Sequence, residues 1–374
     1  MNRADEERQR RKLEHIQAVS TLPDQGGTGF EDVRLVPVSA SECDFDEVSV
    51  DVDFLGCRMA FPMIINAMTG GTVESGQINR RLAAFAARHG LAMAVGSETT
   101  ALRDRKTAPS YTVVREQNPD GVLIANVGMG TRGDVAREAV GLIDADLLQV
   151  HWNTAQELFM PEGDRKFSGL LARLEDVCQA VDVPVIAKEV GQGMSGDAAQ
   201  VFLAHGARAI DIGGRGGTNF IAVEAWRRGM ALDEEWAAWG IPTVTSLIEV
   251  TSAVDGRVPV VASGGIRTGH DVAKSIALGA QVVGVAGPLL RLAKSDDEAA
   301  LDRWFEQVAW TLRAIMVLTG CRRLTDLRSR PAVVGGITRQ WLAARGYGPR
   351  LDAMAERPWR SLAEIPVESP PTTV

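Results

Sequence analysis

The chain has 374 residues, of which 45% are hydrophobic and 24% are charged, and its mean hydropathy is −0.03. These values are typical of an ordinary globular protein and exclude disordered, collagen-like and fibrous chains. Because 40 Lys and Arg stand against 48 Asp and Glu, the formal net charge of −8 lacks the basic excess that a nucleic-acid partner requires.

The cysteines and the N-terminal residues indicate a reducing, aqueous environment. The chain starts with the charged stretch MNRADEERQRRK, and no later apolar run approaches the roughly 20 residues of a membrane span. We therefore expect no membrane partner and a cytoplasmic location. No Cys-x-x-Cys pair occurs, so we expect four reduced, buried thiols, at Cys43, Cys57, Cys178 and Cys321.

From about residue 60, short apolar runs alternate with longer segments of helical periodicity, which is typical of repeated βα units. Eight such runs predict an α/β fold of the TIM (β/α)8 barrel type over residues 61–320. A polar N-terminal segment, 1–60, precedes the barrel, and a helical extension with a proline-rich tail, 321–374, follows it. The predicted strands are Pro62–Ala67, Leu91–Val95, Gly121–Ala125, Leu147–Val150, Pro184–Ala187, Ala209–Ile212, Val258–Ala262 and Gln281–Val285.

Amphipathic segments predict the helices between these strands, and one connection is unusually long. The helices are expected at Asn79–Arg88, Gly133–Ile143, Leu170–Val181, Asp197–His205 and Asp271–Leu278. The long connection, Phe220–Ser246, follows the sixth strand and holds three of the eight tryptophans, Trp226, Trp236 and Trp239. It is interpreted either as a lid or interface, or as an extra helix packed on the barrel rim.

Polar residues and glycines follow all eight predicted strands. In TIM barrels the active site lies at the carboxyl ends of the strands, so this joint pattern predicts a site at that end of the barrel. The residues concerned are Asn66–Gly71, Gly96–Ser97, Asn126, His151–Asn153 with Gln156–Glu157, Lys188–Glu189, Gly213–Thr218, Ser263–Arg267 and Ala286–Gly287.

The ends of the seventh and eighth strands have the composition of a phosphate site. Gly264 and Gly265 leave backbone N–H groups accessible next to a helix N-terminus, and Arg267 can add a charge-assisted contact. Ala286 and Gly287 extend the same edge. By itself, the SGGIR sequence is also consistent with a tight turn between a strand and a helix.

Lys188, at the end of the fifth strand, is suited to the electron-rich pyrimidine edge of a flavin, where a cation stabilises negative charge on the reduced ring. The alternative is a structural lysine that is paired with a carboxylate.

The end of the fourth strand carries candidate catalytic groups. His151 and Asn153 alternate as in an extended segment and so project to the same side. Gln156 could hydrogen-bond a substrate or relay a proton, and Glu157 could hold Mg²⁺ through oxygen. Glu157 is also consistent with a simple favourable charge at a helix N-terminus.

A basic cluster, Arg10, Arg11 and Lys12, is followed by His15 close to the N-terminus. Composition alone favours a solvated helix face. If this helix folds over the barrel mouth, the cluster could instead clamp a diphosphate.

From about Arg11 to Thr319 the chain resembles the type 2 isopentenyl diphosphate isomerases, which are FMN-dependent TIM barrels. The matching motifs occur in order: RKLEHI, INAMTGG, HWNTAQE, PVIAKEVGQGMS, DIGGRGGTNF and SGGIRTGHDV. The resemblance implies interconversion of isopentenyl and dimethylallyl diphosphate with reduced FMN and Mg²⁺ and no net redox change. It also implies NAD(P)H as the flavin reductant, assembly as a homo-oligomer (tetramer or octamer), and a prenyl diphosphate as the small-molecule partner.

Carried over by position, the resemblance also implies roles for individual residues. Arg11 and Lys12 become a substrate clamp, Glu157 a Mg²⁺ ligand, and Gln156 a helper to a flavin that carries the main acid–base duty. The catalytic and substrate-binding group is His151, Asn153 and Gln156. The implied FMN-binding residues are Ala67, Met68, Thr69, Ser97, Asn126, Lys188, Thr218, Gly264, Arg267, Ala286 and Gly287.

One departure and two alternative functions accompany this resemblance. Glu98 and Thr99 stand where many members carry a Gln-Arg or similar pair, and a carboxylate there would repel a diphosphate unless it is turned away. A 2-hydroxy acid oxidase or dehydrogenase uses a related barrel, but it needs a histidine after the sixth strand, where this chain has the glycine run Gly213–Thr218. The second alternative is a barrel that binds FMN or prenyl diphosphates without catalysis.

Overall fold

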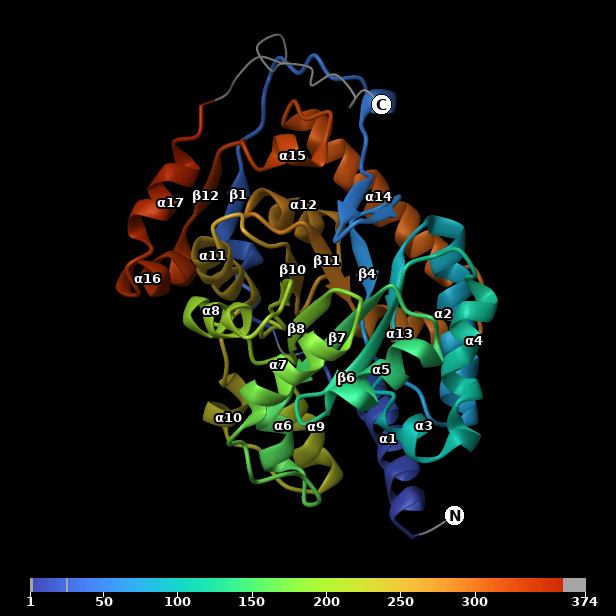
Figure 1. The fold of residues 1–374 in the computed structure, drawn as a ribbon. Coiled ribbons are helices and arrows are strands. Elements are labelled where there is room, and N and C mark those ends of the chain that lie inside the picture. Colours follow the sequence, from blue (N-terminus) through green and yellow to red (C-terminus); the bar gives the residue numbers. More distant parts are fainter. Residues whose placement is uncertain (1–2, 25, 359–374) are drawn as a thin grey trace.

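A computed structural model describes residues 3–24 and 26–358, and its central feature is a closed barrel of eight parallel strands (Figure 1). Their order around the barrel is β10-β11-β4-β5-β6-β7-β8-β9, so each strand pairs with its neighbour in the chain. The predicted TIM barrel is confirmed, and each predicted run overlaps one strand. The strands are β4 (Met63–Ile65), β5 (Ala92–Ala94), β6 (Leu123–Gly128), β7 (Leu147–Trp152), β8 (Val185–Glu189), β9 (Ala209–Asp211), β10 (Val260–Ser263) and β11 (Val282–Val285).

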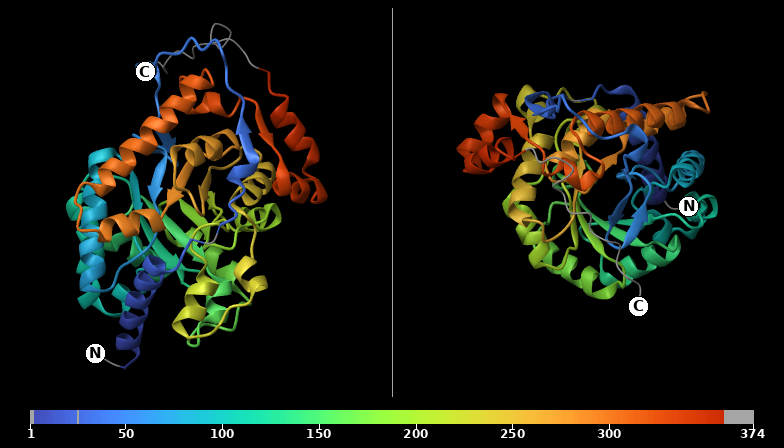
Figure 2. Two further views of the ribbon diagram at one scale, coloured as in Figure 1. Left: turned by 180° about the vertical axis from the view of Figure 1, so that it is seen from behind. Right: turned by 90° about the horizontal axis from the view of Figure 1, so that it is seen from above.

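Helices surround the strands, as the view along the barrel shows (Figure 2). All five amphipathic segments named from the sequence lie in helices. The helices that follow successive barrel strands are α2 (Val73–His89), α4 (Pro109–Gln117), α5 (Gly133–Leu142), α7 (Leu170–Ala180), α8 (Gly196–Ala204), α11 (Thr243–Val254), α12 (Gly269–Ala277) and α13 (Gly287–Lys294). Short helices also lie in the loops between these elements: α3 (Thr99–Arg103), α6 (Thr154–Phe159), α9 (Phe220–Arg227), α10 (Glu234–Ala238), η1 (Phe30–Asp32), η2 (Phe45–Glu47) and η3 (Arg105–Thr107).

The strand residues divide between two apolar cores because side chains alternate across a strand. In β4, Ile64 belongs to the cluster inside the barrel, whereas Met63 and Ile65 belong to the cluster between the barrel and its helices. A hairpin of β2 (Val52–Phe54) and β3 (Cys57–Met59) adds the fully buried Phe54 and Met59 to the inner cluster. The barrel is therefore a packed core, and a ligand site has to form at its rim.

The N- and C-terminal segments meet beside the barrel. Strand β1 (Val33–Leu35) pairs antiparallel with β12 (Ala332–Val334), a pairing that the sequence did not indicate. The C-terminal segment is otherwise helical, and Figure 1 shows α15 and α17 at the opposite end of the molecule from helix α1. The remaining helices are α1 (Arg3–Thr21), α14 (Ala300–Leu318), α15 (Leu324–Leu327), α16 (Gly336–Ala344) and α17 (Gly348–Ala355). The predicted proline-rich tail, 359–374, lies outside the described residues.

The long connection after β9 is helical and shorter than expected. Helices α9 and α10 form it, and α9 packs against α1 and α6 at the mouth of the barrel. From the sequence we expect the connection to end at Ser246. In the structure it ends at Pro242, which caps the next barrel helix, α11, and this helix begins at Thr243. The rings of Trp236 and Trp239 contact each other in a tilted arrangement, with their centroids 5.3 Å apart, and both stay partly exposed.

Two simpler predictions can be compared with the structure directly. All four cysteines are free, as predicted, but only Cys43 and Cys321 are buried, whereas Cys57 and Cys178 are half-buried. None of the helices in the described part of the chain has the length and apolar character that a membrane crossing requires.

Candidate active site

Two adjoining cavities lie at the carboxyl ends of the barrel strands, with volumes of about 630 and 160 Å³. They share lining residues, among them Ala67, Met68 and Lys188, and so form one continuous groove. Every site residue that the sequence singled out lines this groove. The residues that line the larger cavity are Arg11, Lys12, Ala67, Met68, Thr69, Ser97, Asn126, His151, Asn153, Gln156, Glu157 and Lys188. Thr218, Gly264, Arg267, Ala286 and Gly287 line the smaller one.

Glycines shape the smaller cavity at the ends of β10 and β11. Gly264 has φ +106°, and a Cβ atom there would collide with the Gly214 carbonyl. Gly265 also has positive φ, at +73°. At Gly287, the first residue of α13, a Cβ would meet nothing closer than 3.5 Å. Backbone that only glycine can adopt thus surrounds open space next to helix N-termini, which is the arrangement that binds phosphate.

Arg267 lies in this cavity, but its guanidinium is already paired. It donates to the carbonyls of Gly265 and Gly216, both at 2.7 Å, and to Asp24 Oδ2 at 2.9 Å. Arg291 also reaches Asp24 Oδ2, at 3.1 Å. The sequence indicated an Arg267 side chain available to an anion. It missed Asp24, because a single acidic residue in the turn-rich PDQGGTG stretch carries no signal of a partner nearly 250 positions away.

Lys188 satisfies both interpretations drawn from the sequence. Its Nζ lies 3.2 Å from Asp211 Oδ2, as expected for a paired structural lysine, and it also lines both cavities. Asp211 accepts a further hydrogen bond from Asn66 Nδ2 at 2.8 Å. The buried carboxylate therefore fixes the position of an ammonium group that faces the groove.

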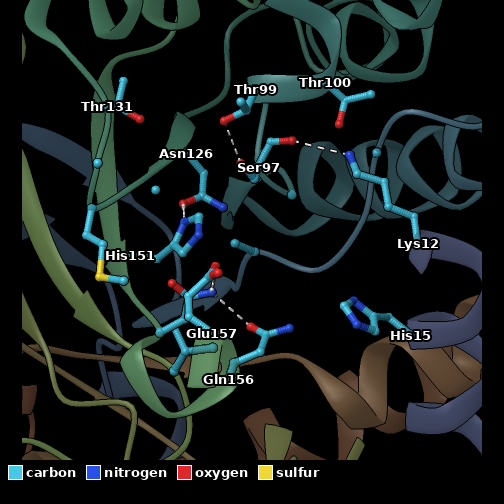
Figure 3. A pocket seen from close by; sticks show the side chains of 18 of the residues that line it. Lys12, His15, Ser97, Thr99, Thr100, Asn126, Thr131, His151, Gln156 and Glu157 are labelled. Atoms are coloured by element: carbon cyan, nitrogen blue, oxygen red, sulfur yellow. Dashed lines mark hydrogen bonds between the residues drawn. The ribbon is translucent and has the colours of Figure 1, made fainter. Parts of the chain in front are cut away.

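The turn after β7 brings four polar side chains together (Figure 3). Asn153 Nδ2 donates to Gln156 Oε1 at 3.1 Å and to Glu157 Oε1 at 3.0 Å. His151 Nδ1 is 3.0 Å from Asn126 Oδ1. Burial, together with the charge of Lys188, lowers the pKa of His151 to about 4, so this imidazole is neutral at physiological pH.

Glu224 of α9 is a functional residue that sequence reasoning missed. Its carboxylate is fully buried; Oε1 accepts from Gln156 Nε2 at 3.1 Å and lies 2.7 Å from His15 Nε2. Burial acts to raise the pKa of Glu224, but the hydrogen bonds from His15 and Gln156 and the charge of Arg227 lower it overall. The available signal was a lone acidic residue in the apolar stretch FIAVEAW.

The basic cluster of α1 divides between solvent and the groove. Arg10 is exposed and pairs with Glu14 at 3.3 Å, as a solvated helix face predicts. Arg11, Lys12 and His15 line the larger cavity, so for them the solvated interpretation is wrong. Figure 3 shows Lys12 and His15 entering the pocket from α1, across from His151.

Lys12 is held by neutral groups. Its Nζ donates to Tyr111 Oη at 2.5 Å and to the Ser97 carbonyl at 3.3 Å. Burial, and secondarily the charge of Arg11, lowers the pKa of Lys12 to about 7. The charge of Glu98 acts in the opposite direction but is too weak to offset these two effects.

The carboxylate that departs from the family pattern is turned away from the groove. Glu98 is fully buried and does not line either cavity, and its Oε2 accepts the Asn126 backbone N–H at 2.9 Å. Burial raises the pKa of Glu98 to about 8, so it is mainly protonated at neutral pH. The repulsion considered from the sequence is thus removed by position and by protonation. Thr99 does line the groove and hydrogen-bonds Ser97 Oγ at 3.1 Å.

The groove fits a phosphate-bearing cofactor better than a protein-only metal site. Besides the glycine cradle, the hydroxyl of Thr69 is buried at the larger cavity and has no hydrogen-bond partner. Within the described residues, no group of three His, Cys, Asp or Glu side chains could hold a metal ion. A divalent cation at Glu157 would therefore depend on oxygens from a bound ligand.

Comparison with known proteins first defines the class. Residues 148–333 match a family model described as FMN-dependent dehydrogenase. Two solved structures of mandelate oxidase variants share the fold. The first variant matches with a TM-score of 0.60 at 21% identity, over 86% of this chain and 92% of that chain. The second variant matches with a TM-score of 0.62 at 20% identity, over 87% of this chain and 98% of that chain. The fold is thus that of the FMN-dependent dehydrogenase class of barrels.

Closer relatives define the family within that class. The chain is 43% identical to the isopentenyl-diphosphate delta-isomerase of Bacillus licheniformis, over 93% of this chain and 99% of that protein. It is 44% identical to the protein of the same name from Moorella thermoacetica, over 90% of this chain and 97% of that one. The chain belongs to the isopentenyl-diphosphate delta-isomerase family, which confirms the resemblance seen in the motifs.

The site gives no support to the 2-hydroxy acid oxidase alternative. After β9 the chain continues into the glycine run, and His205 is a half-buried residue just after α8 whose Nδ1 contacts the Val201 carbonyl. The histidines that line the two cavities are His15 and His151. The likeness to mandelate oxidase is therefore a likeness of fold.

Proposed function

We propose that this enzyme interconverts isopentenyl diphosphate and dimethylallyl diphosphate in isoprenoid biosynthesis, with reduced FMN and Mg²⁺ and without net redox change. The observation that carries the proposal is the continuous groove with two different ends. The end at Gly264 and Gly287 is a backbone cradle for one phosphate, and the end at Arg11 and Lys12 offers cationic side chains to a second anion. A flavin mononucleotide and a prenyl diphosphate together require these two ends.

The cofactor would be held along the smaller cavity and the groove floor. The residues that would hold it are Ala67, Met68, Thr69, Ser97, Asn126, Lys188, Thr218, Gly264, Arg267, Ala286 and Gly287. When bound, reduced FMN supplies an electron-rich ring that stabilises positive charge on a reacting alkene and can take part in proton transfer. The Arg267 guanidinium already donates to Asp24. To bind the FMN phosphate it would either give up Asp24 or contact both anions at once.

The substrate diphosphate would be held at the other end. Arg11 and Lys12 supply charge from α1, and His151 supplies a neutral hydrogen-bonding imidazole. Glu157 would bind Mg²⁺ with diphosphate oxygens completing the coordination, since a carboxylate plus substrate phosphates is a usual arrangement for this ion. Its Oε1 is positioned by Asn153 and its Oε2 by the Asp164 backbone N–H at 2.9 Å.

Isomerisation of the alkene requires a proton to be added at one carbon and removed from another. Gln156 is placed for this step because Asn153 and the buried Glu224 fix both ends of its amide. A neutral amide is a poor base, so its part is to orient and hydrogen-bond the reacting groups. His151, Asn153 and Gln156 form the proposed catalytic group.

Family membership supports further proposals. NAD(P)H is the proposed reductant of the flavin, and the enzyme is proposed to act in the cytoplasm as a homo-oligomer, tetramer or octamer. Residues 1–60 would serve as the segment that carries the substrate clamp, 61–320 as the FMN-binding barrel, and 321–374 as the C-terminal extension.

The test is an anaerobic assay of the purified protein with FMN, Mg²⁺ and isopentenyl diphosphate. We expect dimethylallyl diphosphate with dithionite-reduced flavin and none with oxidised flavin. Gln156→Ala should lower turnover at least 100-fold, whereas Gln179→Ala, an exposed position on α7, should leave it unchanged. FMN binding without product would favour the non-catalytic barrel, and bleaching of the flavin by a 2-hydroxy acid would favour the oxidase.

A further inference from the structure

A third cavity, of about 440 Å³, lies at the amino-terminal end of the barrel. Its floor is formed by Val258–Val260, just before and at the start of β10, and by Gly279 and Gln281, just before β11. Four arginines line it, and no aspartate or glutamate does. They are Arg257, Arg328, Arg350 and Arg357.

This cavity is separate from the candidate active site. It shares no lining residue with either of the other two cavities. Arg328 follows α15 and Arg350 lies in α17, and both helices stand at the end of the molecule opposite α1 and α6 (Figure 1). A ligand here would contact the barrel strands and the C-terminal extension at once.

The arginines are not neutralised by the described part of the chain. None of the four has a carboxylate within 4.0 Å there, although the chain as a whole carries eight more acidic than basic residues. Arg328 is half-buried, and its Nε is fully buried without a hydrogen-bond partner. Burial lowers the pKa of Arg328 and of Arg357, and the charge of Arg350 lowers the pKa of Arg357 further.

Helix capping accounts for only part of this arrangement. Arg257 Nε donates to the Val254 carbonyl at the end of α11, and Arg357 Nη1 donates to the Ala277 carbonyl at the end of α12. Each helix C-terminus carries about half a negative charge, so two of them offset about one of the four positive charges. The other acceptors that these guanidinium groups have among the described residues are Gln200 Oε1 and the carbonyls of Ala253, Ala280 and Arg330, so most of their N–H groups have no acceptor there.

We propose that this cavity is a second anion-binding site that takes a small phosphate-bearing molecule with two or more negative charges. Planar guanidinium groups bind phosphate oxygens in pairs, and several of them together require a multiply charged ligand. The volume lies within the range of small-molecule sites. Val254, Val258 and Pro259 add an apolar wall, which suits an organic phosphate ester as well as an inorganic anion.

The test uses inorganic diphosphate as the probe, titrated calorimetrically into the FMN-loaded full-length protein at pH 7 and fixed ionic strength. We expect two binding events. Lys12→Met should weaken one event and leave the other unchanged. Arg350→Gln combined with Arg257→Gln should weaken the other at least tenfold; both positions are exposed, so folding should be preserved.

Arg137→Gln is the matched control, because Arg137 is also exposed and also donates to a helix C-terminal carbonyl, that of Ala180 at 3.0 Å. It should change neither event. The proposal is overturned if the wild type shows no event beyond the one that depends on Lys12, or if a second event survives the double substitution. Equal binding of sulfate would also overturn it. Loss of isomerase activity in any variant bears on the proposed function and not on this site.

Discussion

Lys12 leads to a prediction about how diphosphate binding depends on pH. In the free protein its pKa is about 7, chiefly because it is buried beside neutral partners and Arg11. A bound diphosphate supplies the missing counter-charge and returns the pKa toward the ordinary value of about 10.4. Binding therefore takes up a proton at pH values above 7, and the affinity falls as the pH rises.

The magnitude follows from linkage. Each pH unit well above 7 costs up to tenfold in affinity until the pKa of the complex is reached. Because Lys12 is already half deprotonated at pH 7, the dissociation constant should rise up to about 50-fold between pH 7 and pH 9. Ionisation of Glu98, whose pKa is raised by burial to about 8, has two opposite effects. Its negative charge repels the diphosphate, but it also raises the pKa of Lys12 and so reduces the loss of affinity at high pH.

The assay is calorimetric titration of isopentenyl diphosphate into the FMN-loaded protein at pH 6, 7, 8 and 9. Lys12→Met should bind more weakly at pH 6 and lose most of the pH dependence. Lys106→Met, at an exposed lysine that does not line the groove, should behave like the wild type. Since the ionisation of the ligand is common to all variants, equal slopes for wild type and Lys12→Met would refute the reasoning.

Three further predictions concern single side chains of the groove. Gly264→Ala should weaken FMN binding at least tenfold by equilibrium titration, because its methyl group collides with a backbone carbonyl, whereas Gly141→Ala, in open space on α5, should not. Glu224→Ala should lower the free energy of unfolding in urea by about 1–3 kcal/mol, because it removes the buried acceptor of Gln156 and one of the three carboxylates that pair with Arg227. Glu235→Ala, at an exposed position, should change it by less than about 0.5 kcal/mol. The pKa of His151 is about 4, so its NMR resonances should stay constant from pH 5.5 to 8.5, and a titration near 6.5 would contradict the structure.

The barrel could be predicted because its signals are local. Strands such as Leu147–Trp152 are short buried apolar runs, and each is followed by a polar or glycine residue at the end where a barrel site forms. The strands that were missed, β1, β2, β3 and β12, have three residues each, and β1 and β12 pair across almost the whole chain. Nothing in so short a segment indicates a partner at that distance.

The residues that line the groove could also be predicted, because they lie at the carboxyl ends of the barrel strands. The carboxylates that hydrogen-bond to them could not be predicted. His151, Gln156 and Lys188 follow strands and therefore converge, whereas Asp24 and Glu224 reach the groove from segments outside the βα pattern. The orientation of Glu98, which is turned away from the groove, also depends on tertiary contacts that the sequence does not indicate.

The most direct test of the account follows product and flavin together in one anaerobic reaction in D₂O. Holoenzyme reduced with dithionite is mixed with isopentenyl diphosphate and Mg²⁺, the flavin is followed by absorbance, and the product by proton NMR. The account predicts deuterium-containing dimethylallyl diphosphate over many turnovers while the flavin stays reduced. Oxidation of the flavin in step with product, or a reduced flavin without any product, would contradict it.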